Sequence, residues 1–563
     1  MFLVSIMVYY LLFEAKYMDN PLDIRRSSRP QSTLLQAWPW MGVLLVIILV
    51  GFVRYRLLDM PLERDEGEYA YAGQMLLQGI PPYSQAWNMK LPGTYFAYAC
   101  GMLAFGQTIA GVHATLMAVN SLTIIFVFLL GRKLFGPLAG LFASACFGIL
   151  SVSPAVMGMA GHANHFVIFF AVPATYLLCK AMESGELRTF FLSGLLYGLG
   201  FLMKQQGICF CVFAIPMVLW SAVQNGSLFS FTCIRRLFAI GIGMLVPFGL
   251  ACLYFNYAGV FDKFWFWTAT YAHSYATEVT PQEGLAKFLG YFDKKWPIYI
   301  GFLGFIGIAL PAIAWNRAYR PQIIFAMMFA LFSVLATAID FNFREHYFIL
   351  LLPALAVLFG LGAMALCESG GPPVKVGSVL VCLLVLGFAV YLQRPFFFQL
   401  PARTISQIIY SGDTPFTEVP AVGDYIRDHS KTKDTVAVVG SEPEIYFYAE
   451  RHSATGFMYT YPMMETQPYA SQMQHDMIKE IEMDKPTFLV FVNSPDSWNV
   501  RPASDKTVFK WFPQYANASY DRVGALYQSD LDAAKFVAGE GLKTNQISAS
   551  EVITVFRRKP TAL

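Results

Sequence analysis

The sequence predicts a polytopic α-helical membrane protein with a C-terminal domain of mixed α/β structure. Of its 563 residues, 56% are hydrophobic and only 14% are charged, whereas soluble domains average about 45–50% and about 25%. Apolar stretches recur between residues 38 and 392, and a run of about 20 apolar residues is long enough to span a bilayer. Beyond residue 392 the composition becomes polar and mixed, which indicates a separate folded part.

The composition also excludes several classes of protein. It excludes a disordered chain, a fibrous repeat and an ordinary soluble enzyme, because none of these carries so much apolar sequence. The 40 Lys+Arg and 37 Asp+Glu residues give a net charge of +3, which does not indicate nucleic acid binding. The nine cysteines end at Cys382 and lie in or beside apolar runs. Because their spacing matches no metal motif, we interpret them as packing residues.

The chain divides into three predicted regions: a cytoplasmic N-terminal arm (1–37), a membrane-spanning module (38–392) and an exterior α/β domain (393–563). The arm carries three arginines before the first span, and basic residues are enriched on the cytoplasmic side. Two starts of translation remain open, Met1 and Met18.

The predicted spans are interrupted by two long loops, at 58–93 and 257–296, which we place outside the cell. One span precedes the first loop, at 38–57. Seven apolar stretches lie between the loops, at 94–109, 113–131, 138–154, 165–180, 189–203, 206–223 and 237–256. Four more follow the second loop, at 297–315, 322–339, 347–366 and 376–392.

The number of crossings must satisfy parity. Basic residues in the short connections orient the later spans, and they are Arg235, Arg236, Arg317, Arg320 and Lys375. With the N-terminus in the cytoplasm, the second loop is exterior only if an odd number of the eight stretches before it cross the membrane. One stretch is therefore re-entrant, half-length or fused with a neighbour, and 94–109 would be only about 24 Å long as a helix. The sequence predicts about 11 spans, and up to about 13.

The C-terminal domain is predicted to contain a small sheet packed by helices. "DTVAVVG" at 434–440 and "PTFLVFV" at 486–492 are typical of buried strands. Amphipathic stretches at 420–429 and 470–483 are typical of helices. Neither strand is followed by a glycine-rich phosphate-binding motif, so no nucleotide site is indicated.

The first exterior loop contains the strongest candidate for chemistry. Asp65, Glu66 and Glu68 open a predicted helix, and acids also occur in a first helical turn for purely structural reasons. The functional interpretation is that Asp65 and Glu66 form a carboxylate pair, one a general base towards an acceptor hydroxyl and the other orienting it. Tyr83 and Lys90 follow in the same loop. Lys90 either extends to the membrane surface or binds a lipid phosphate at headgroup height.

Three further groups supply candidate binding residues. Lys204 lies between two apolar runs, where a charge by default faces a cavity, although a simple turn lysine remains possible. Arg344, His346 and Tyr347 stand at the mouth of a span, either as a phosphate site or as part of an interfacial belt. His273, in the second loop, is a candidate ligand. A divalent metal held by histidines and carboxylates is possible, but no short ligand spacing supports it.

Several short motifs together resemble a known family. They are "RDEGEYAYAGQML", "MKLPGTYFAY", "GLLYGLGFLMKQQG", "FWFWTATYAHSYA" and "HYFILLLPAL", in an order that covers roughly residues 50–400. In this order they resemble the GT-C-fold glycosyltransferases that use polyprenyl-phosphate sugars, nearest to the protein O-mannosyltransferase and aminoarabinose–lipid A transferase group. The resemblance implies that Asp65 is the catalytic base and that Lys90 and Lys204 contact the carrier phosphate.

The sequence also departs from that group. It has Lys90-Leu91-Pro92 where members often have Lys-Pro-Pro, and Asn164 near the place where many have Asp. The second loop lacks the Glu-His-x-x-Arg pattern of the aminoarabinose transferases. The asparagine at position 164 argues against a metal or acid role there. The missing pattern in the second loop argues against aminoarabinose as the sugar substrate.

Two classes of function follow from these patterns. The first is an inverting membrane glycosyltransferase that moves a sugar from a polyprenyl-phosphate donor to an envelope glycan, lipid or protein, in the bacterial inner (plasma) membrane. The second is a secondary transporter with an exterior charged substrate site. The crowding of polar residues on one face and the large C-terminal domain favour the enzyme. A structural subunit of an envelope assembly is a third, non-catalytic alternative.

Overall fold

The computed structural model describes residues 33–314, 319–410, 414–527, 535–539, 542 and 551–560. The predicted cytoplasmic arm at 1–37 therefore lies almost wholly outside the described residues. The chain forms two compact units. The bundle unit comprises the chain up to Arg56, Leu116–Leu250 and Val279–Leu400, and the sheet unit comprises Leu57–Thr115, Ala251–Glu278 and the chain from Pro401 onward.

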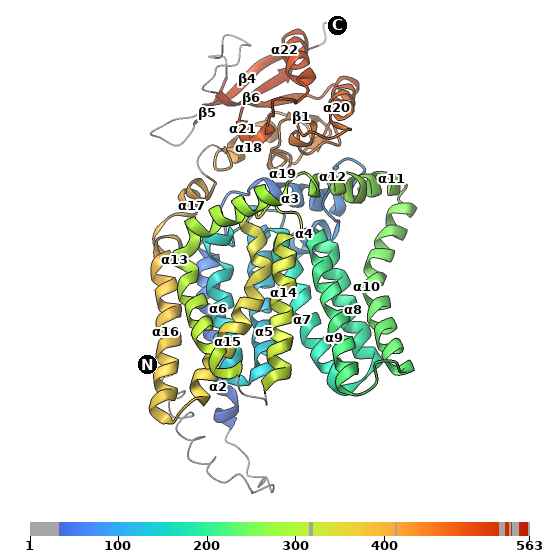
Figure 1. Cartoon of the computed structure of the whole chain (residues 1–563). Coiled ribbons are helices and arrows are strands. Elements are labelled where there is room, and N and C mark those ends of the chain that lie inside the picture. The colour runs from blue at the N-terminus through green and yellow to red at the C-terminus, as the bar shows by residue number, and fades with distance from the viewer. Residues whose placement is uncertain are drawn as a thin grey trace. The chain divides into compact units, whose positions relative to one another are not determined.

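The bundle unit is built from long apolar helices (Figure 1). Those lying wholly or mostly in it are α2 (Thr33–Tyr55), α5 (Ile109–Phe135), α6 (Pro137–Ser151), α7 (Ala163–Ser184), α8 (Leu187–Met203), α9 (Ile208–Gln224), α10 (Phe231–Tyr257), α13 (Pro281–Ala314), α14 (Arg320–Ala338), α15 (Leu352–Glu368) and α16 (Pro372–Arg394). A 3₁₀ turn, η5 (Glu345–Leu351), leads into α15. These helices coincide with the predicted spans, so the polytopic helical fold class is confirmed.

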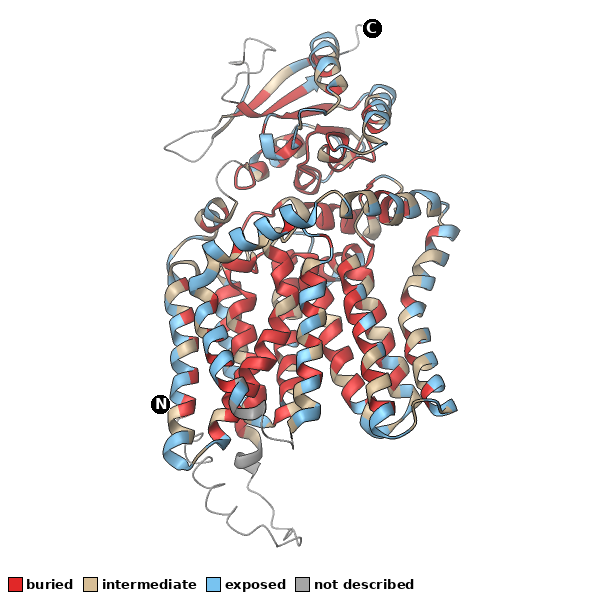
Figure 2. Cartoon of the chain, in the orientation of Figure 1, coloured by how far each residue is buried: buried red, intermediate tan, exposed pale blue. Residues whose placement is uncertain are grey.

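Length and composition alone qualify eight helical segments of the described chain to cross a membrane, and two further apolar helices, α6 and α8, are shorter. Burial separates a central helix from peripheral ones (Figure 2). The segment Glu345–Glu368 is 89% buried, whereas Phe231–Tyr257 is only 17% buried. The exposed side chains of α10 include Phe238, Leu245 and Leu253, as expected for a surface in contact with lipid rather than water.

Close packing in the centre of the bundle depends on small residues. A Cβ added to Gly360 of α15 would lie 2.2 Å from the carbonyl oxygen of Ala139 in α6. Only glycine therefore permits this approach of the two helices, and small residues allow the same close packing of helices in membranes.

The sheet unit combines loop and C-terminal segments. Its helices are α3 (Arg64–Leu77), α4 (Gly93–Phe105), α11 (Phe261–Trp265), α12 (Ala272–Ala276), α17 (Ala402–Ile409), α18 (Val419–Asp428), α19 (Glu444–Ala449), α20 (Ala470–Asp484), α21 (Pro495–Trp498) and α22 (Thr507–Ser519). Its strands are β1 (Thr435–Val439), β2 (His452–Ser453), β3 (Phe488–Val492), β4 (Tyr520–Tyr527), β5 (Lys535–Ala538) and β6 (Glu551–Arg558).

The six strands form one mixed sheet in the order β2-β1-β3-β6-β4-β5. β1 runs parallel to β2 and β3, and the remaining neighbours are antiparallel. Every residue of β3 is buried, as its unbroken apolar run indicates for a central strand. The predicted strands at 434–440 and 486–492 and the predicted helices at 420–429 and 470–483 correspond to β1, β3, α18 and α20.

The helix α4 resolves the parity problem. It is 13 residues long, or about 20 Å, and it belongs to the sheet unit together with the residues on both sides of it. The apolar stretch predicted at 94–109 is therefore a half-length helix. Among the described residues, seven helices of the bundle unit then precede the second loop, and four follow it.

The second predicted loop differs from expectation in one respect. Only its first part, up to Glu278, belongs to the sheet unit. The residues from Pro281 onward are already helical and continue without a break into the predicted span as α13. The reason is that "PQEGLAKFLGYFDKKW" combines helix-forming residues with an amphipathic pattern.

Candidate active site

The helix α3 places two carboxylates on one face. It begins after Glu63, whose side chain accepts a hydrogen bond from the backbone N–H of Glu66 at 2.9 Å, while the Glu66 carboxylate accepts one from the Glu63 N–H at 3.4 Å. This capping box fixes the start of the helix. Asp65 and Glu68 are three residues apart, and residues at that spacing are neighbours on a helix surface.

Lys90 joins the two carboxylates. Its Nζ donates to Asp65 Oδ1 at 2.5 Å, to Glu68 Oε2 at 2.7 Å and to the hydroxyl of Tyr459 at 3.2 Å. An ammonium has three N–H donors, so these three acceptors match its capacity. We call Asp65, Glu68, Lys90 and Tyr459 the acid–lysine cluster. Burial favours a lower pKa for Lys90, but Asp65 and Glu68 outweigh it and the pKa is raised, which keeps the lysine protonated.

The two carboxylates of the cluster differ in their access to solvent. The side chain of Glu68 is 1% exposed and that of Asp65 is 25% exposed. Glu68 also accepts a hydrogen bond from Tyr95 at 2.5 Å, so Tyr95, Tyr459 and Lys90 all donate to it. Asp65 is therefore the solvent-accessible carboxylate of the cluster, and Glu68 is the buried one.

This arrangement corrects our interpretation of Glu68. The structural interpretation placed Glu68 among the acids of a first helical turn, but Glu68 is a buried member of the cluster. The other candidate, Glu66, is occupied by the capping box and lies 3.1 Å from Nε2 of His113. The i, i+3 spacing of Asp65 and Glu68 was the sequence signal that distinguishes them from Glu66.

The remaining predicted residues of the sheet unit have different positions. Tyr83 is fully buried, and its hydroxyl donates to the backbone carbonyl of Lys90 at 2.7 Å. It therefore orients the lysine through the main chain. His273 lies in α12 and is exposed.

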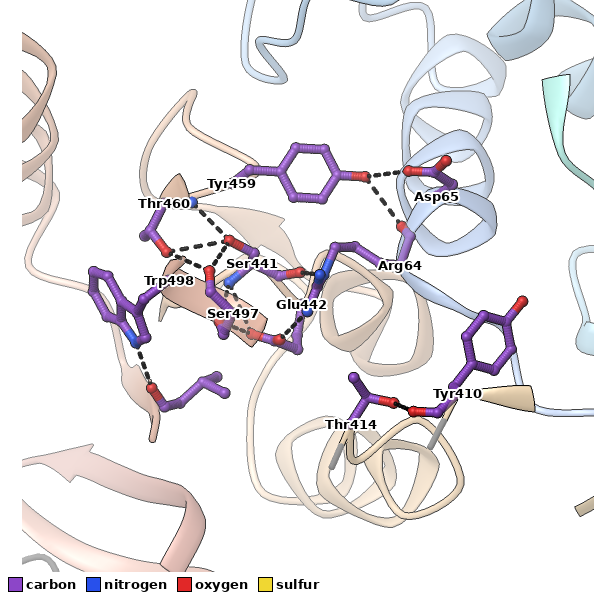
Figure 3. Close-up of polar contacts among 11 residues, drawn as sticks. Arg64, Asp65, Tyr410, Thr414, Ser441, Glu442, Tyr459, Thr460, Ser497 and Trp498 are labelled. Atoms are coloured by element: carbon purple, nitrogen blue, oxygen red, sulfur yellow. Dashed lines mark hydrogen bonds and ion pairs between the residues drawn. The ribbon is translucent and has the colours of Figure 1, made fainter. Parts of the chain in front are cut away.

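A polar network connects α3 to the sheet (Figure 3). The guanidinium of Arg64 donates from Nε to the carbonyl of Ser441 at 2.6 Å and from Nη2 to Glu442 at 3.0 Å. Glu442 is buried and also accepts from the Ser497 hydroxyl at 2.7 Å. A Cβ on Gly67 would lie 2.3 Å from Cβ of Glu444 in α19, so glycine allows α3 to lie directly on α19.

The bundle unit holds the second group of predicted residues. Lys204 has extended backbone geometry where α8 ends. Its Nζ donates to Asn164 Oδ1 at 3.0 Å and lies 4.1 Å from the centre of the Tyr347 ring. This cation–π contact is worth about 2 kcal/mol when desolvated. The structure therefore brings Lys204 and Tyr347 together, although they are far apart in sequence.

The neighbours of Tyr347 are organised by η5. The ring of His346 stacks on His162 with centroids 4.2 Å apart, and both histidines are buried. Arg344 precedes η5 and is exposed. The neighbouring Glu345 pairs with Lys295 at 3.3 Å.

Sequence reasoning missed two residues of the site, Tyr95 and Tyr459, which donate to Glu68. Asn164, which the sequence analysis weighed for a metal or acid role, accepts from Lys204 instead. Tyr95 was within the quoted motif after Lys90, so its proximity was a usable signal. Tyr459 lies 369 residues after Lys90, in a segment with no motif, and only the folded chain identifies it.

Comparisons with known proteins agree with this fold. Residues 90–250 match the family described as dolichyl-phosphate-mannose-protein mannosyltransferase. The chain is 23% identical over 368 residues to the undecaprenyl phosphate-alpha-4-amino-4-deoxy-L-arabinose arabinosyl transferase of Pseudomonas paraeruginosa, covering 59% of this chain and 63% of the relative. A second such transferase, from Pseudomonas fluorescens, is 24% identical over 53% of this chain and 54% of its own length. The chain thus spans less than two thirds of the length of these curated relatives.

Solved structures extend the similarity to nearly the whole chain. ArnT from Cupriavidus metallidurans, bound to undecaprenyl phosphate, superposes with a TM-score of 0.58 at 13% identity and covers 92% of this chain and 98% of its own. The oligosaccharyltransferase AglB from Archaeoglobus fulgidus, in complex with an inhibitory peptide and a dolichol-phosphate, gives a TM-score of 0.50 at 11% identity over 93% and 76%. The fold is that of the GT-C glycosyltransferases, and the resemblance indicated by the sequence motifs is confirmed.

Proposed function

We propose that the chain is a membrane glycosyltransferase that moves a sugar from a polyprenyl-phosphate donor to a glycan, lipid or protein acceptor with inversion. The observation that carries the proposal is the acid–lysine cluster, in which an accessible Asp65 stands beside a buried Glu68 and a protonated Lys90. The GT-C fold and the similarity to transferases that use undecaprenyl-phosphate sugars support it. A secondary transporter is not favoured, because neither relatives nor structural neighbours indicate one.

In this reaction Asp65 is the general base. It accepts the proton of the acceptor hydroxyl as the oxygen attacks the anomeric carbon, and the carrier phosphate leaves from the opposite face. Lys90 holds Asp65 in position through its ammonium. Because its three donors are already engaged, Lys90 contacts a phosphate only by giving up one of these acceptors.

The leaving phosphate needs cations that stabilise its charge in a water-poor site. We assign Lys204 and Arg344 to this phosphate, with His346 and Tyr347 as neighbouring ligands. Tyr83 and Glu66 act indirectly, Tyr83 through the main chain of Lys90 and Glu66 through the start of α3. His273 contacts the acceptor side. Arginine can hold two phosphate oxygens at once. A divalent metal remains a proposal: His162 and His346 are suitable ligand types, and chelation by EDTA followed by activity and metal analysis tests it.

We further propose that the protein resides in a bacterial inner membrane with the sheet unit outside. The supporting observation is that three segments separated by helices of the bundle, 57–115, 251–278 and the chain from 401, pack into one unit. Segments that pack together lie on one side of a bilayer. All three are therefore on the same side.

The decisive experiment has two parts. Mass spectrometry of envelope lipids and glycans from a deletion strain identifies the missing sugar and hence the donor. Transfer of that sugar by the purified protein in nanodiscs is then compared for wild type, Asp65→Asn and Asp59→Asn. Asp59 is an exposed acid of the same loop and serves as the control.

We expect Asp65→Asn to lower turnover by about 10²–10⁴-fold, because a positioned base contributes that much. Asp59→Asn should retain wild-type turnover. Full activity of Asp65→Asn would exclude Asp65 as the base, and an unaltered envelope in the deletion strain would exclude the transferase itself.

A further inference from the structure

We propose that Tyr459, contributed by the C-terminal part of the chain, is a positioning residue of the active site that holds Glu68 and shares Lys90 with the two carboxylates. This inference rests on the proposed function and assigns a role to a residue outside every motif discussed above.

The hydroxyl of Tyr459 contacts all three charged members of the cluster. It lies 2.7 Å from Glu68 Oε2, 3.2 Å from Lys90 Nζ and 3.4 Å from Asp65 Oδ1. A phenol donates one hydrogen bond and accepts others. The shortest contact assigns the donated proton to Glu68, while the ammonium of Lys90 donates to the phenol oxygen.

Tyr459 is suited to this role because it remains a neutral donor. The residue is 3% exposed. Burial, together with the nearby carboxylates of Glu68 and Asp65, raises the pKa of Tyr459 well above its ordinary value. The phenol therefore keeps its proton at any physiological pH.

The main chain around Tyr459 is anchored to the first loop. Trp87 N–H donates to the carbonyl of Gly456 at 2.6 Å, and Trp87 pairs with Phe457 in a parallel bridge. A Cβ on Gly456 would lie 2.3 Å from the Trp87 ring, so the two segments are in close contact. The backbone next to Tyr459 is thus bonded to Trp87, which lies three residues before Lys90.

Loss of the Tyr459 hydroxyl affects the reaction through Lys90. With Tyr459 present, its three N–H groups are divided among one phenol and two carboxylates. Without the phenol oxygen, one N–H loses its acceptor and Glu68 loses one of its three donors. Lys90 then shifts between Asp65 and Glu68, and the geometry of the general base changes.

The test uses Tyr459→Phe with two comparison variants. Tyr95→Phe removes the other phenol from Glu68 and leaves the acceptors of Lys90 in place. Tyr520→Phe removes a buried phenol of the same unit that donates to the carbonyl of Pro486 at 2.9 Å, outside the cluster. Turnover and KM for the polyprenyl-phosphate sugar are measured in nanodiscs, and thermal midpoints are measured for each variant.

We expect Tyr459→Phe to lower kcat by about 10-fold or more, the effect of losing a hydrogen bond to a charged group, with KM for the donor unchanged. Tyr95→Phe should lower kcat less, and Tyr520→Phe should leave it unchanged. In the Glu68→Gln background, Tyr459→Phe should cost much less, because contacting residues are not additive. The thermal midpoints should show the same non-additivity.

The outcomes separate this inference from the proposed function. If Asp65→Asn is inactive but Tyr459→Phe turns over normally, or loses no more than Tyr95→Phe, the role of Tyr459 is overturned and the transferase stands. If the wild type transfers no polyprenyl-linked sugar, the proposed function fails. In that case additive thermal midpoints of Tyr459→Phe and Glu68→Gln overturn the inference as well, and coupled midpoints support the pairing.

Discussion

Individual residues of the site divide into those that meet solvent and those that support them. Asp65 is a quarter exposed, whereas Glu68 is buried beneath it. Two acids of similar chemistry thus have different environments three residues apart. The difference arises because α3 faces solvent at Asp65. One turn further along the helix, Glu68 is covered by Tyr95 and Tyr459.

Glu68→Gln should lower turnover and stability together. The amide keeps the shape but removes the charge to which Lys90, Tyr95 and Tyr459 donate, and a hydrogen bond to a charged group contributes about 1.5–3 kcal/mol. We expect turnover to fall by about 10–150-fold and the thermal midpoint to fall with it. Glu482→Gln, at an exposed acid of the same unit, is the control for the loss of one charge. An unchanged thermal midpoint of Glu68→Gln would contradict the buried position.

A second acid predicts a dependence of stability on pH. Burial, and then the charge of Glu442, raise the pKa of Glu444 well above its ordinary value. The folded form therefore binds a proton that the unfolded form has lost. Stability contributed by this group is fully present below about pH 4.5 and is lost as the pH rises towards the raised value.

In Glu444→Gln this titration is absent. We expect its thermal midpoint to change less between pH 5 and pH 8 than that of the wild type, and to be higher than the wild type at pH 8. Circular dichroism melts at several pH values measure this. Parallel curves for the two proteins would show that Glu444 is ionised in the folded state.

At the scale of elements, α3 is the part of the chain on which the site is built. Its capping box fixes the first turn, Gly67 lets it approach α19, and Arg64 ties it to the end of β1. Each of these features lies within five residues of Asp65. The orientation of Asp65, the proposed general base, is thus set by the same helix turn that docks on the sheet.

Arg64→Met should destabilise the sheet unit and reduce activity. The change leaves the buried carboxylate of Glu442 without its guanidinium, at a cost of about 1.5–3 kcal/mol. Arg403→Met is the matched control, because Arg403 is 53% exposed and pairs with Glu418 at 3.3 Å. Such an exposed pair contributes about 0–1 kcal/mol. Thermal midpoints of the two variants decide the matter, and equal effects would show that the Arg64 contact is not structural.

At the scale of the whole molecule, the half-length helix α4 decides which topology we expect for the chain. Because α4 remains within the sheet unit, seven helices of the bundle unit lie between the start of α2 and the second loop among the described residues. This odd number returns the chain to the side of the first loop. Arg235 and Arg236 orient α10, the last of these seven helices, and Lys375 orients α16 after the second loop, both independently of the count.

Reporter fusions test this topology. Fusions after residues 228 and 370 should report the cytoplasm, and a fusion after residue 450 should report the exterior. The reason is that basic residues follow the first two positions and remain inside. An inward signal at 450 would place the acid–lysine cluster on the wrong side for an exterior acceptor.

The motif resemblance indicated Asp65 and Lys90 separately, and the structure joins them by a hydrogen bond. The sequence by itself determined the membrane class, the positions of the long helices, and the strands β1 and β3. These features depend on composition and local periodicity, which a short window of sequence contains. The pairing of Lys204 with Tyr347 and the half-length of α4 were only partly accessible, since both depend on packing between distant segments.

Only the tertiary structure decided which acid accompanies Asp65 and which tyrosine completes the cluster. The i, i+3 spacing only favours Glu68 over Glu66 as the neighbour of Asp65. The capping box at Glu66 and the cover that Tyr95 and Tyr459 provide for Glu68 decide between the two acids. Tyr459 reaches Lys90 across 369 residues, held by a backbone bridge to Trp87. Such contacts form when the chain closes on itself, so local sequence patterns do not contain them.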